Sequence, residues 1–488
     1  MDFVFAFKVV PSFILRPARD IGIDHFPPRL KDIAKYNPLQ PLAEFTLLSP
    51  TSEKNDAEAP GGDSAQPAAA RQSSRLLDAL LRLRALEALR HREFRLLWYG
   101  NVFGSMAMWM DQVARGWLIY ELTNSPFQLG LVRGVQAIPF LLLSPVAGTA
   151  ADRYSRKMQV LVAQVADGLL YAMLALLILT GKIEPWHVYV TAFAMAAVQT
   201  FQQPARAAMV ADAVPLGYLT NAIGLNAIVF NVARSTGPAL AGILIAMFGT
   251  ASSYAVQAVF YFLATIWTVM LRPAERPSAG SHGHPAHGES FGRSIVEGWK
   301  FSWRNEVVRT GLLIAMFASL FIIPFTTLLP VFARDLLGVG ASGQGLLLTA
   351  MGVGALCSAV LIAAVGDRLP RGALMLGGVA LYGLIVIAFS ASPWFELSLA
   401  LMGIVGLCHV SSHALVQTVI QTYSPPEFRG RTIAIFHMSQ VVLTVGSMLI
   451  GALSSLLGAQ WAMASMSAAG MLTMLAIYVA LPRAWLIR

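Results

Sequence analysis

Five ionisable side chains fall inside long apolar segments in the first half of the chain. Placing such a group at the centre of a membrane helix costs roughly 2.5 to 3.5 kcal/mol on insertion scales, so these residues are functional candidates by default. A carboxyl group in a low-dielectric setting can load and release a proton, and a guanidinium nearby can hold it as a carboxylate instead. The five residues are Asp111, Arg115, Arg133, Asp167 and Arg234.

Asp111 and Arg115 are four residues apart, and this spacing puts both on one face of a helix. Asp111 is therefore a candidate proton carrier, and the alternative is a structural ion pair with Arg115 or with Arg133. The second half of the chain offers three polar candidates that could line a cavity. Two of these, the histidines, also share a helical face and could relay protons, although an interior histidine with a structural role is at least as common. The three are His409, His413 and Gln417.

The elements that position these residues are apolar spans. With 56% hydrophobic and 12% charged residues, the 488-residue chain is far more apolar than a soluble protein. We predict an all-α, polytopic membrane protein with twelve transmembrane helices, each long enough for a hydrocarbon core of roughly 30 Å. The predicted spans are 95–121, 127–150, 158–180, 186–206, 221–248, 251–271, 307–333, 343–365, 371–391, 394–419, 431–457 and 460–482.

The predicted organisation has five parts. Residues 1–70 are expected to be a disordered extension, and 71–93 a basic amphipathic helix lying in the membrane interface. Two halves of six spans follow, 94–271 and 307–488, joined by a cytoplasmic linker at 272–306. The linker contains His282, His284 and His287, which in a Gly- and Pro-rich segment indicate a solvated tether rather than a metal site.

Basic residues gather in alternate loops, which places both termini and the linker in the cytoplasm by the positive-inside rule. The net charge of +9 is explained by this topology, so we expect no nucleic-acid partner. Cys357 and Cys408 lie inside predicted spans without metal-ligand spacing, and no phosphate-binding Gly-x-x-x-x-Gly-Lys loop is present. We therefore expect no metal, no cofactor and no direct use of ATP.

A charged turn separates the second and third predicted spans and recurs about 215 residues later. The sequence Gly-Thr-Ala-Ala-Asp-Arg-Tyr-Ser-Arg-Lys is echoed by Asp-Arg-Leu-Pro-Arg, with Ala363 where the first copy has glycine. Both copies resemble the signature loop of the major facilitator superfamily. The resemblance implies gating loops that close the cytoplasmic side in one state, with Gly148 allowing close helix packing. The gating candidates are Gly148, Asp152, Arg153, Arg156, Lys157, Asp367, Arg368 and Arg371.

The fifth predicted span carries Arg-Ser-Thr-Gly-Pro-Ala-Leu-Ala-Gly, ending at Gly242. Pro238 removes one backbone hydrogen bond and is expected to kink the helix, while Gly237 and Gly242 permit close helix contact. The segment resembles the Gly-Pro motif of superfamily antiporters. A kinked packing helix without a transport role is the alternative.

Residues 94–481 as a whole resemble the drug and siderophore exporter branch of this superfamily, through Phe94–Trp98, Tyr120–Pro126, Leu129–Val132, Arg234–Pro238 and Gln421–Arg431. The resemblance implies a monomeric exporter in the cell inner membrane that moves small amphipathic molecules by alternating access, with protons and the lipid bilayer as partners. It also places span three partly outside the cavity, which ranks Asp111 above Asp167 as the coupling residue.

Three rivals remain. The first is an importer of a polar metabolite, which would need a more polar cavity than the sequence indicates. The second is a non-transporting receptor on the same fold. The third is a membrane-bound enzyme, for which the chain shows no cluster of catalytic groups, so we expect no enzymatic activity. For the gating loop, we expect Asp152→Asn to abolish transport while substrate binding is retained.

Overall fold

The computed structural model describes residues 84–272, 291–365 and 371–481, and within these ranges the secondary structure is entirely helical. This confirms the all-α fold. The first half contains α2 (Arg92–Thr123), α3 (Pro126–Arg153), α4 (Arg156–Leu179), α5 (Pro185–Asp212), α6 (Leu219–Phe248) and α7 (Thr250–Val269). The second half contains α9 (Glu306–Phe317), α10 (Leu329–Val331), α11 (Gly340–Val365), α12 (Arg371–Ala391), α13 (Phe395–Tyr423), α14 (Pro426–His437), α15 (Ser439–Leu457) and α16 (Ala459–Ala480).

Nine helical segments in the described ranges are long and apolar enough to cross a membrane. The more polar α2 and α5 fall outside this set, and α13 contributes only a shorter apolar stretch, Phe395–His409, so the count of twelve stays a prediction. Large apolar side chains on the outer faces of the helices are exposed, for example Leu176 at 62% and Leu472 at 66%. Because exposed apolar surface on this scale needs a partner, these faces contact the lipid bilayer.

The seventh predicted span is interrupted. Its path from Glu306 to Leu336 passes through α9, a π-helical turn, a 3₁₀ segment containing Pro324, the short α10 and a second π-helical turn. Proline cannot donate to the carbonyl four residues back, so the backbone switches to other hydrogen-bond patterns around it. The sequence predicted one uninterrupted helix here.

Two shorter elements flank the halves. The described part of the predicted interfacial helix is a 3₁₀ segment, η3 (Arg84–Arg90), whose Ala88 N–H donates to Asn221 Oδ1 at 2.9 Å. Residues 1–83 lie outside the described ranges, as do 273–290 with the three linker histidines. The remainder of the predicted linker contains a helix, α8 (Phe291–Arg304), which packs on α14 through a Glu297–Arg431 ion pair of 2.9 Å.

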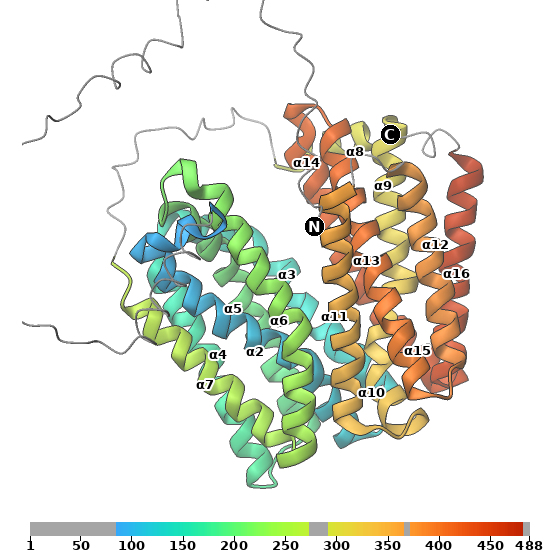
Figure 1. Ribbon diagram of the computed structural model, residues 1–488, viewed down its shortest axis with the longest axis horizontal. Coiled ribbons are helices and arrows are strands. Elements are labelled where there is room, and N and C mark those ends of the chain that lie inside the picture. Colours follow the sequence, from blue (N-terminus) through green and yellow to red (C-terminus); the bar gives the residue numbers. More distant parts are fainter. Residues whose placement is uncertain (1–83, 273–290, 366–370, 482–488) are drawn as a thin grey trace, which may run out of the picture. The chain divides into compact units, whose positions relative to one another are not determined.

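The two halves pack together through α6 against α11 (Figure 1) and through α3 against α15. The helices approach closely because glycines lie at the contacts. A Cβ atom built on Gly242 would lie 2.5 Å from the Ala341 carbonyl oxygen, and one built on Gly130 would lie 2.5 Å from that of Ser447. These contacts lie toward the C-terminal ends of α6 and α15 and the N-terminal end of α3.

Polar contacts join the halves at the same end of the bundle. The Arg334 guanidinium donates to Asn124 Oδ1 at 2.6 Å and lies 5.2 Å from the centre of the Tyr120 ring. The Tyr120 hydroxyl donates to Asp335. We call this end, defined by these four residues, the closed end; the end at which α3 meets α4 is called the open end.

Candidate functional site

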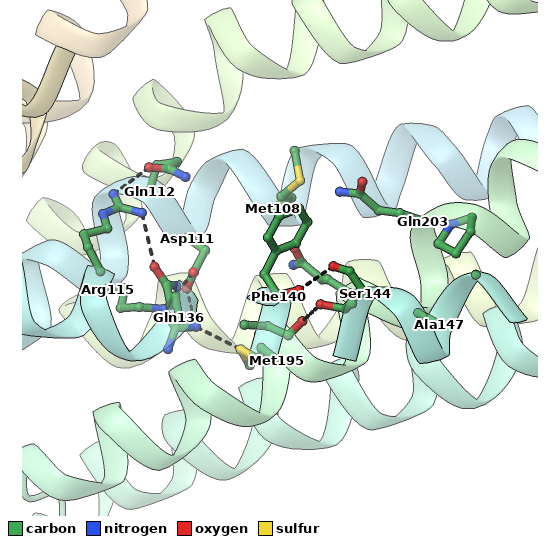
Figure 2. Close-up of a pocket in the computed structure, with 16 residues that line it drawn as sticks. Met108, Asp111, Gln112, Arg115, Gln136, Phe140, Ser144, Ala147, Met195 and Gln203 are labelled. Carbon is green, nitrogen blue, oxygen red and sulfur yellow. Dashed lines mark hydrogen bonds and ion pairs between the residues drawn. The ribbon is translucent and has the colours of Figure 1, made fainter. Parts of the chain in front are cut away.

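A cavity of about 460 Å³ lies within the first half, between α2, α3 and α5. Figure 2 shows Asp111, Gln112 and Gln136 toward one end of this lateral cavity and Ala147 and Gln203 toward the other. Since its lining reaches the last turns of α3, the lateral cavity extends from the middle of the bundle toward the open end.

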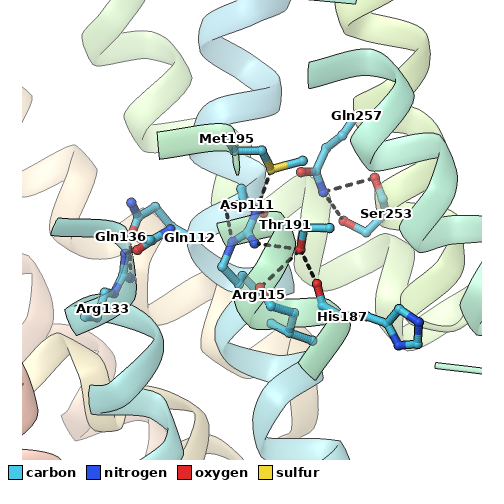
Figure 3. A network of polar contacts seen from close by, with 11 residues as sticks. Asp111, Gln112, Arg115, Arg133, Gln136, His187, Thr191, Met195, Ser253 and Gln257 are labelled. Atoms are coloured by element: carbon cyan, nitrogen blue, oxygen red, sulfur yellow. Dashed lines mark hydrogen bonds and ion pairs between the residues drawn. The ribbon is translucent and has the colours of Figure 1, made fainter. Parts of the chain in front are cut away.

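Asp111 and Arg115 form a two-pronged ion pair on α2, as their spacing predicted. Arg115 Nε and Nη2 donate to the two carboxylate oxygens at 2.8 and 3.0 Å. The guanidinium also contacts Thr191 Oγ1 at 3.4 Å and Met195 Sδ at 2.8 Å on α5 (Figure 3). Such charge-assisted contacts satisfy both oxygens of the Asp111 carboxylate.

Arg133 on α3 belongs to a separate network. Its guanidinium donates to Gln112 Oε1 at 2.7 Å and to Gln136 Oε1 at 3.4 Å (Figure 3). In the part of the chain that the structure describes, no carboxylate forms an ion pair with Arg133. The expected alternative pairing of Asp111 with Arg133 is therefore not formed, and Arg133 presents a positive charge neutralised by no protein side chain there.

Asp167 on α4 is fully buried, with 0% of its surface exposed. Tyr261 and Arg206 are its polar neighbours, yet neither carboxylate oxygen meets hydrogen-bond geometry with any described residue. An ionised carboxylate in this setting lacks the partners it needs. Asp167 does not line the lateral cavity, in agreement with the position that the resemblance implied for its span.

Arg206, the residue at which the fourth predicted span ends, does not lie at the end of a helix. It lies inside α5, where Nη1 donates to Asn101 Oδ1 of α2 at 3.0 Å. The fourth predicted span ended at 206, whereas α5 continues for six more residues to Asp212. Pro204 falls inside this helix. Because proline often marks a helix end, the predicted span ended too early.

A second cavity, of about 700 Å³, lies between the two halves. Gln112 lines both cavities, so the two adjoin at that side chain. Three residues predicted from sequence meet in this central cavity: Arg234 from α6, and His409 and Gln417 from α13. The side chain of His413 lies outside the described part of the structure.

Sequence reasoning missed most of the central cavity's polar lining. Asn231, Gln440 and Trp109 face the same space as Arg234. Ionisable side chains stand out in apolar spans, whereas neutral amides and indoles do not. The lining is consequently more polar than the sequence indicated.

The Gly-Pro segment packs as expected at both glycines. A Cβ atom on Gly237 would lie 2.8 Å from Trp109 Cβ on α2, and one on Gly242 would meet the backbone of α11. Pro238 lies within the continuous helix α6 and lines the central cavity.

The first charged turn ties helices of its own half together. Ser155 caps α4, Arg156 forms an ion pair with Asp212 at 2.5 Å, and Lys157 Nζ donates to the Val269 and Leu271 carbonyls at the end of α7. Arg153 is the last residue of α3.

Close packing at Gly148 was predicted, but a Cβ atom there would meet no described residue within 4 Å. The residue instead lines the lateral cavity. The other gating candidates, Asp367 and Arg368 and the side chains of Asp152 and Arg371, lie outside what the structure describes.

Comparison with known proteins places this geometry in a family. Residues 84–485 match the family model described as transmembrane secretion effector. The multidrug efflux pump Tap of Mycobacterium tuberculosis is 27% identical over 71% of this chain and 83% of its own length. The staphyloferrin A transporter of Staphylococcus aureus is 23% identical (74% and 88%), and the enterobactin exporter EntS of Escherichia coli is 24% identical (75% and 86%).

Solved structures agree on the fold. A bacterial homologue of the lysosomal transporter Spinster, in an inward-facing and unoccupied conformation, superposes with a TM-score of 0.61 at 15% identity, covering 83% of this chain and 97% of the other. The nucleoside transporter NupG gives 0.61 at 12% identity, covering 79% and 98%. The chain is thus a multi-pass membrane transporter with the major facilitator fold, and it belongs to the transmembrane secretion effector family.

Proposed function

We propose that this protein is a secondary active exporter of small amphipathic molecules that works by alternating access. The central cavity carries the proposal: it lies between two halves that are joined at the closed end, around a region that both halves line. Rocking the halves about this cavity would expose it to each side in turn. Efflux relatives support the direction.

The predicted orientation in the membrane indicates which state of the transport cycle the structure represents. If the open end faces the cytoplasm, as the basic loops indicate, then the described conformation is the inward-facing one. The contacts that Arg156 and Lys157 make within their own half are compatible with that state.

Proton antiport is the drive we propose, and the geometry favours Asp167 over Asp111 as the coupling carboxyl group. Asp111 is bound to Arg115 through two hydrogen bonds, whereas neither oxygen of the buried Asp167 meets hydrogen-bond geometry with a described residue. A group of this kind can exchange a proton when a conformational change alters its surroundings.

The test is transport in inverted membrane vesicles, with amphipathic dyes of both charge signs added to the medium. We expect dye accumulation when an inside-acid proton gradient is imposed and loss of accumulation when the gradient is collapsed. Movement that persists without any gradient would contradict proton coupling, and an absence of movement for every dye would contradict export of this substrate class.

A polar-metabolite importer is the second candidate, since the central cavity is lined by Asn231, Gln417 and Gln440 besides Arg234. The direction of substrate transport distinguishes the exporter from the importer. Uptake into right-side-out vesicles driven by an inward proton gradient would favour import.

A further inference from the structure

The charges that line the two adjoining cavities do not balance. Among the described lining residues, the acidic side chain is Asp111, and the cationic ones are Arg115, Arg133 and Arg234. Arg115 neutralises Asp111. Arg133 and Arg234 are left without a carboxylate partner among the residues the structure describes, on either side of the shared Gln112.

The Arg234 side chain packs against an aromatic ring and does not extend into solvent. Its guanidinium carbon lies 5.6 Å from the centre of the Trp109 ring, a cation–π distance. The indole ring in turn meets Phe230 edge-on, with ring centres 5.4 Å apart. Trp109 can sit this close to α6 because Gly237, three residues after Arg234, has no side chain.

The hydrogen-bond donors of Trp109 and Arg234 in the central cavity lack acceptors among the described residues. Trp109 Nε1 is buried and has no hydrogen-bond acceptor among the described residues. The Arg234 guanidinium carries five N–H donors that no described carboxylate accepts. A buried donor left unsatisfied is costly, and an unpaired charge in a membrane span more so. Both costs would fall if a ligand brought negative charge and acceptor oxygens.

We propose that the central cavity binds the anionic head group of its cargo between Arg234 and the Trp109 N–H. This inference rests on the proposed transport function and names its substrate class: amphipathic molecules bearing a carboxylate or a comparable oxyanion. Arg133, across Gln112, adds positive potential on the lateral side. Cationic amphiphiles are disfavoured, because the described cavities offer them no free carboxylate.

The test uses two xanthene dyes of matched size and opposite charge, fluorescein and rhodamine 123. Fluorescence anisotropy measures their binding to the purified full-length protein in nanodiscs of zwitterionic lipid, so that lipid charge does not contribute. We expect fluorescein to bind about tenfold more tightly, as one charge-assisted hydrogen bond implies.

Variants locate the effect. Arg234→Gln should weaken fluorescein binding about tenfold and leave rhodamine 123 unchanged or tighter. Arg234→Lys should retain part of the affinity, and Trp109→Phe, which keeps the ring but removes the N–H, should weaken it several-fold. Arg95→Gln is the matched control, since Arg95 is exposed on α2, the helix that carries Trp109, outside both cavities, and the charge change is identical to that of Arg234→Gln.

Two outcomes overturn the inference: tighter binding of rhodamine 123 than of fluorescein, or equal fluorescein affinities for Arg234→Gln and Arg95→Gln. If Arg234→Gln does not fold, the fluorescein affinities of Trp109→Phe and Arg234→Lys test the inference in its place. Vesicle transport separates this inference from the exporter proposal. Fluorescein binding without transport would support the anion site and contradict export. Transport of rhodamine 123 alone would support export and contradict the anion site.

Discussion

Asp111 and Arg115 differ in burial, and the difference decides what each contributes to stability. The Arg115 side chain is 4% exposed, whereas that of Asp111 is 15% exposed and borders the lateral cavity. Removing the carboxylate leaves a buried guanidinium without a counter-charge. Removing the guanidinium leaves a carboxylate that cavity water can solvate. The two losses should therefore be unequal.

We expect Asp111→Asn to lower the free energy of unfolding by about 3 kcal/mol, and Arg115→Gln to lower it by less. The double variant should recover part of the loss, because it leaves no uncompensated charge. Chemical unfolding of the purified protein in detergent measures all three. Equal losses for the two single variants would show that burial does not control the pair.

Asp167→Asn tests the proposed coupling residue. Because the amide has nearly the shape of the carboxyl group and neither carboxylate oxygen meets hydrogen-bond geometry with a described residue, the substitution should cost little stability. We expect gradient-driven accumulation to be abolished, while exchange of substrate across the membrane at equal concentrations continues. Glu396→Gln, at an exposed site on α13, is the control. If accumulation survives in Asp167→Asn, the proton is carried elsewhere.

Local spacing predicted the residue contacts that form within one helix, and little beyond them. The i, i+4 relation of Asp111 and Arg115 follows from helical geometry alone. The contacts of Arg133 with Gln112 and of Arg206 with Asn101 join different helices, so they depend on packing that a single sequence does not determine. The partners are neutral amides, which carry no signal in an apolar span.

At the scale of elements, close packing of α6 on α11 holds the closed end. A Cβ atom on Gly242 would lie 2.5 Å from the Ala341 carbonyl oxygen and 3.2 Å from Gly345 Cα, both backbone atoms that cannot rotate away. Gly224, on the same helix, has no described residue within 4 Å of such an atom. The two glycines therefore allow one substitution to be compared in two surroundings.

We expect Gly242→Ala to separate α6 from α11 and raise the population of the state open at this end, whereas Gly224→Ala should behave as the native chain. The measurement is the rate at which a membrane-impermeant thiol reagent, added from the closed-end side, labels Thr326→Cys in a variant lacking Cys357 and Cys408. Thr326 lines the central cavity. Equal labelling rates in both alanine variants would contradict the role of this contact.

Element positions followed from hydropathy, but internal breaks did not. The apolar run from 307 to 333 marked a span correctly because burial in lipid selects apolar residues whatever the local hydrogen-bond pattern. The π and 3₁₀ turns within it depend on how Pro324 and Pro330 pack against neighbouring helices. Helix α8 was not foreseen, since its short amphipathic pattern lies in a segment otherwise typical of a linker.

At the scale of the whole molecule, the state of the transporter is set by which end of the two halves is joined. Transport requires that the closed end open in part of the cycle, so its contacts must be weak enough to break. Arg334 joins this end through Asn124 and the Tyr120 ring, and the contact is partly exposed. Polar contacts at an exposed site contribute on the order of 1 kcal/mol, enough to bias a population without locking it.

Arg334→Gln should therefore shift the population rather than destroy the fold. We expect labelling of Thr326→Cys from the closed-end side to become about fivefold faster, which corresponds to about 1 kcal/mol, with thermal stability close to that of the native chain. Lys182→Gln is the control, because Lys182 is an exposed cation in a loop at the same end. If both variants label at the native rate, the Arg334 contacts do not hold the closed end shut. If Arg334→Gln instead unfolds the protein, the contact belongs to the stability of the fold and not to the balance between states.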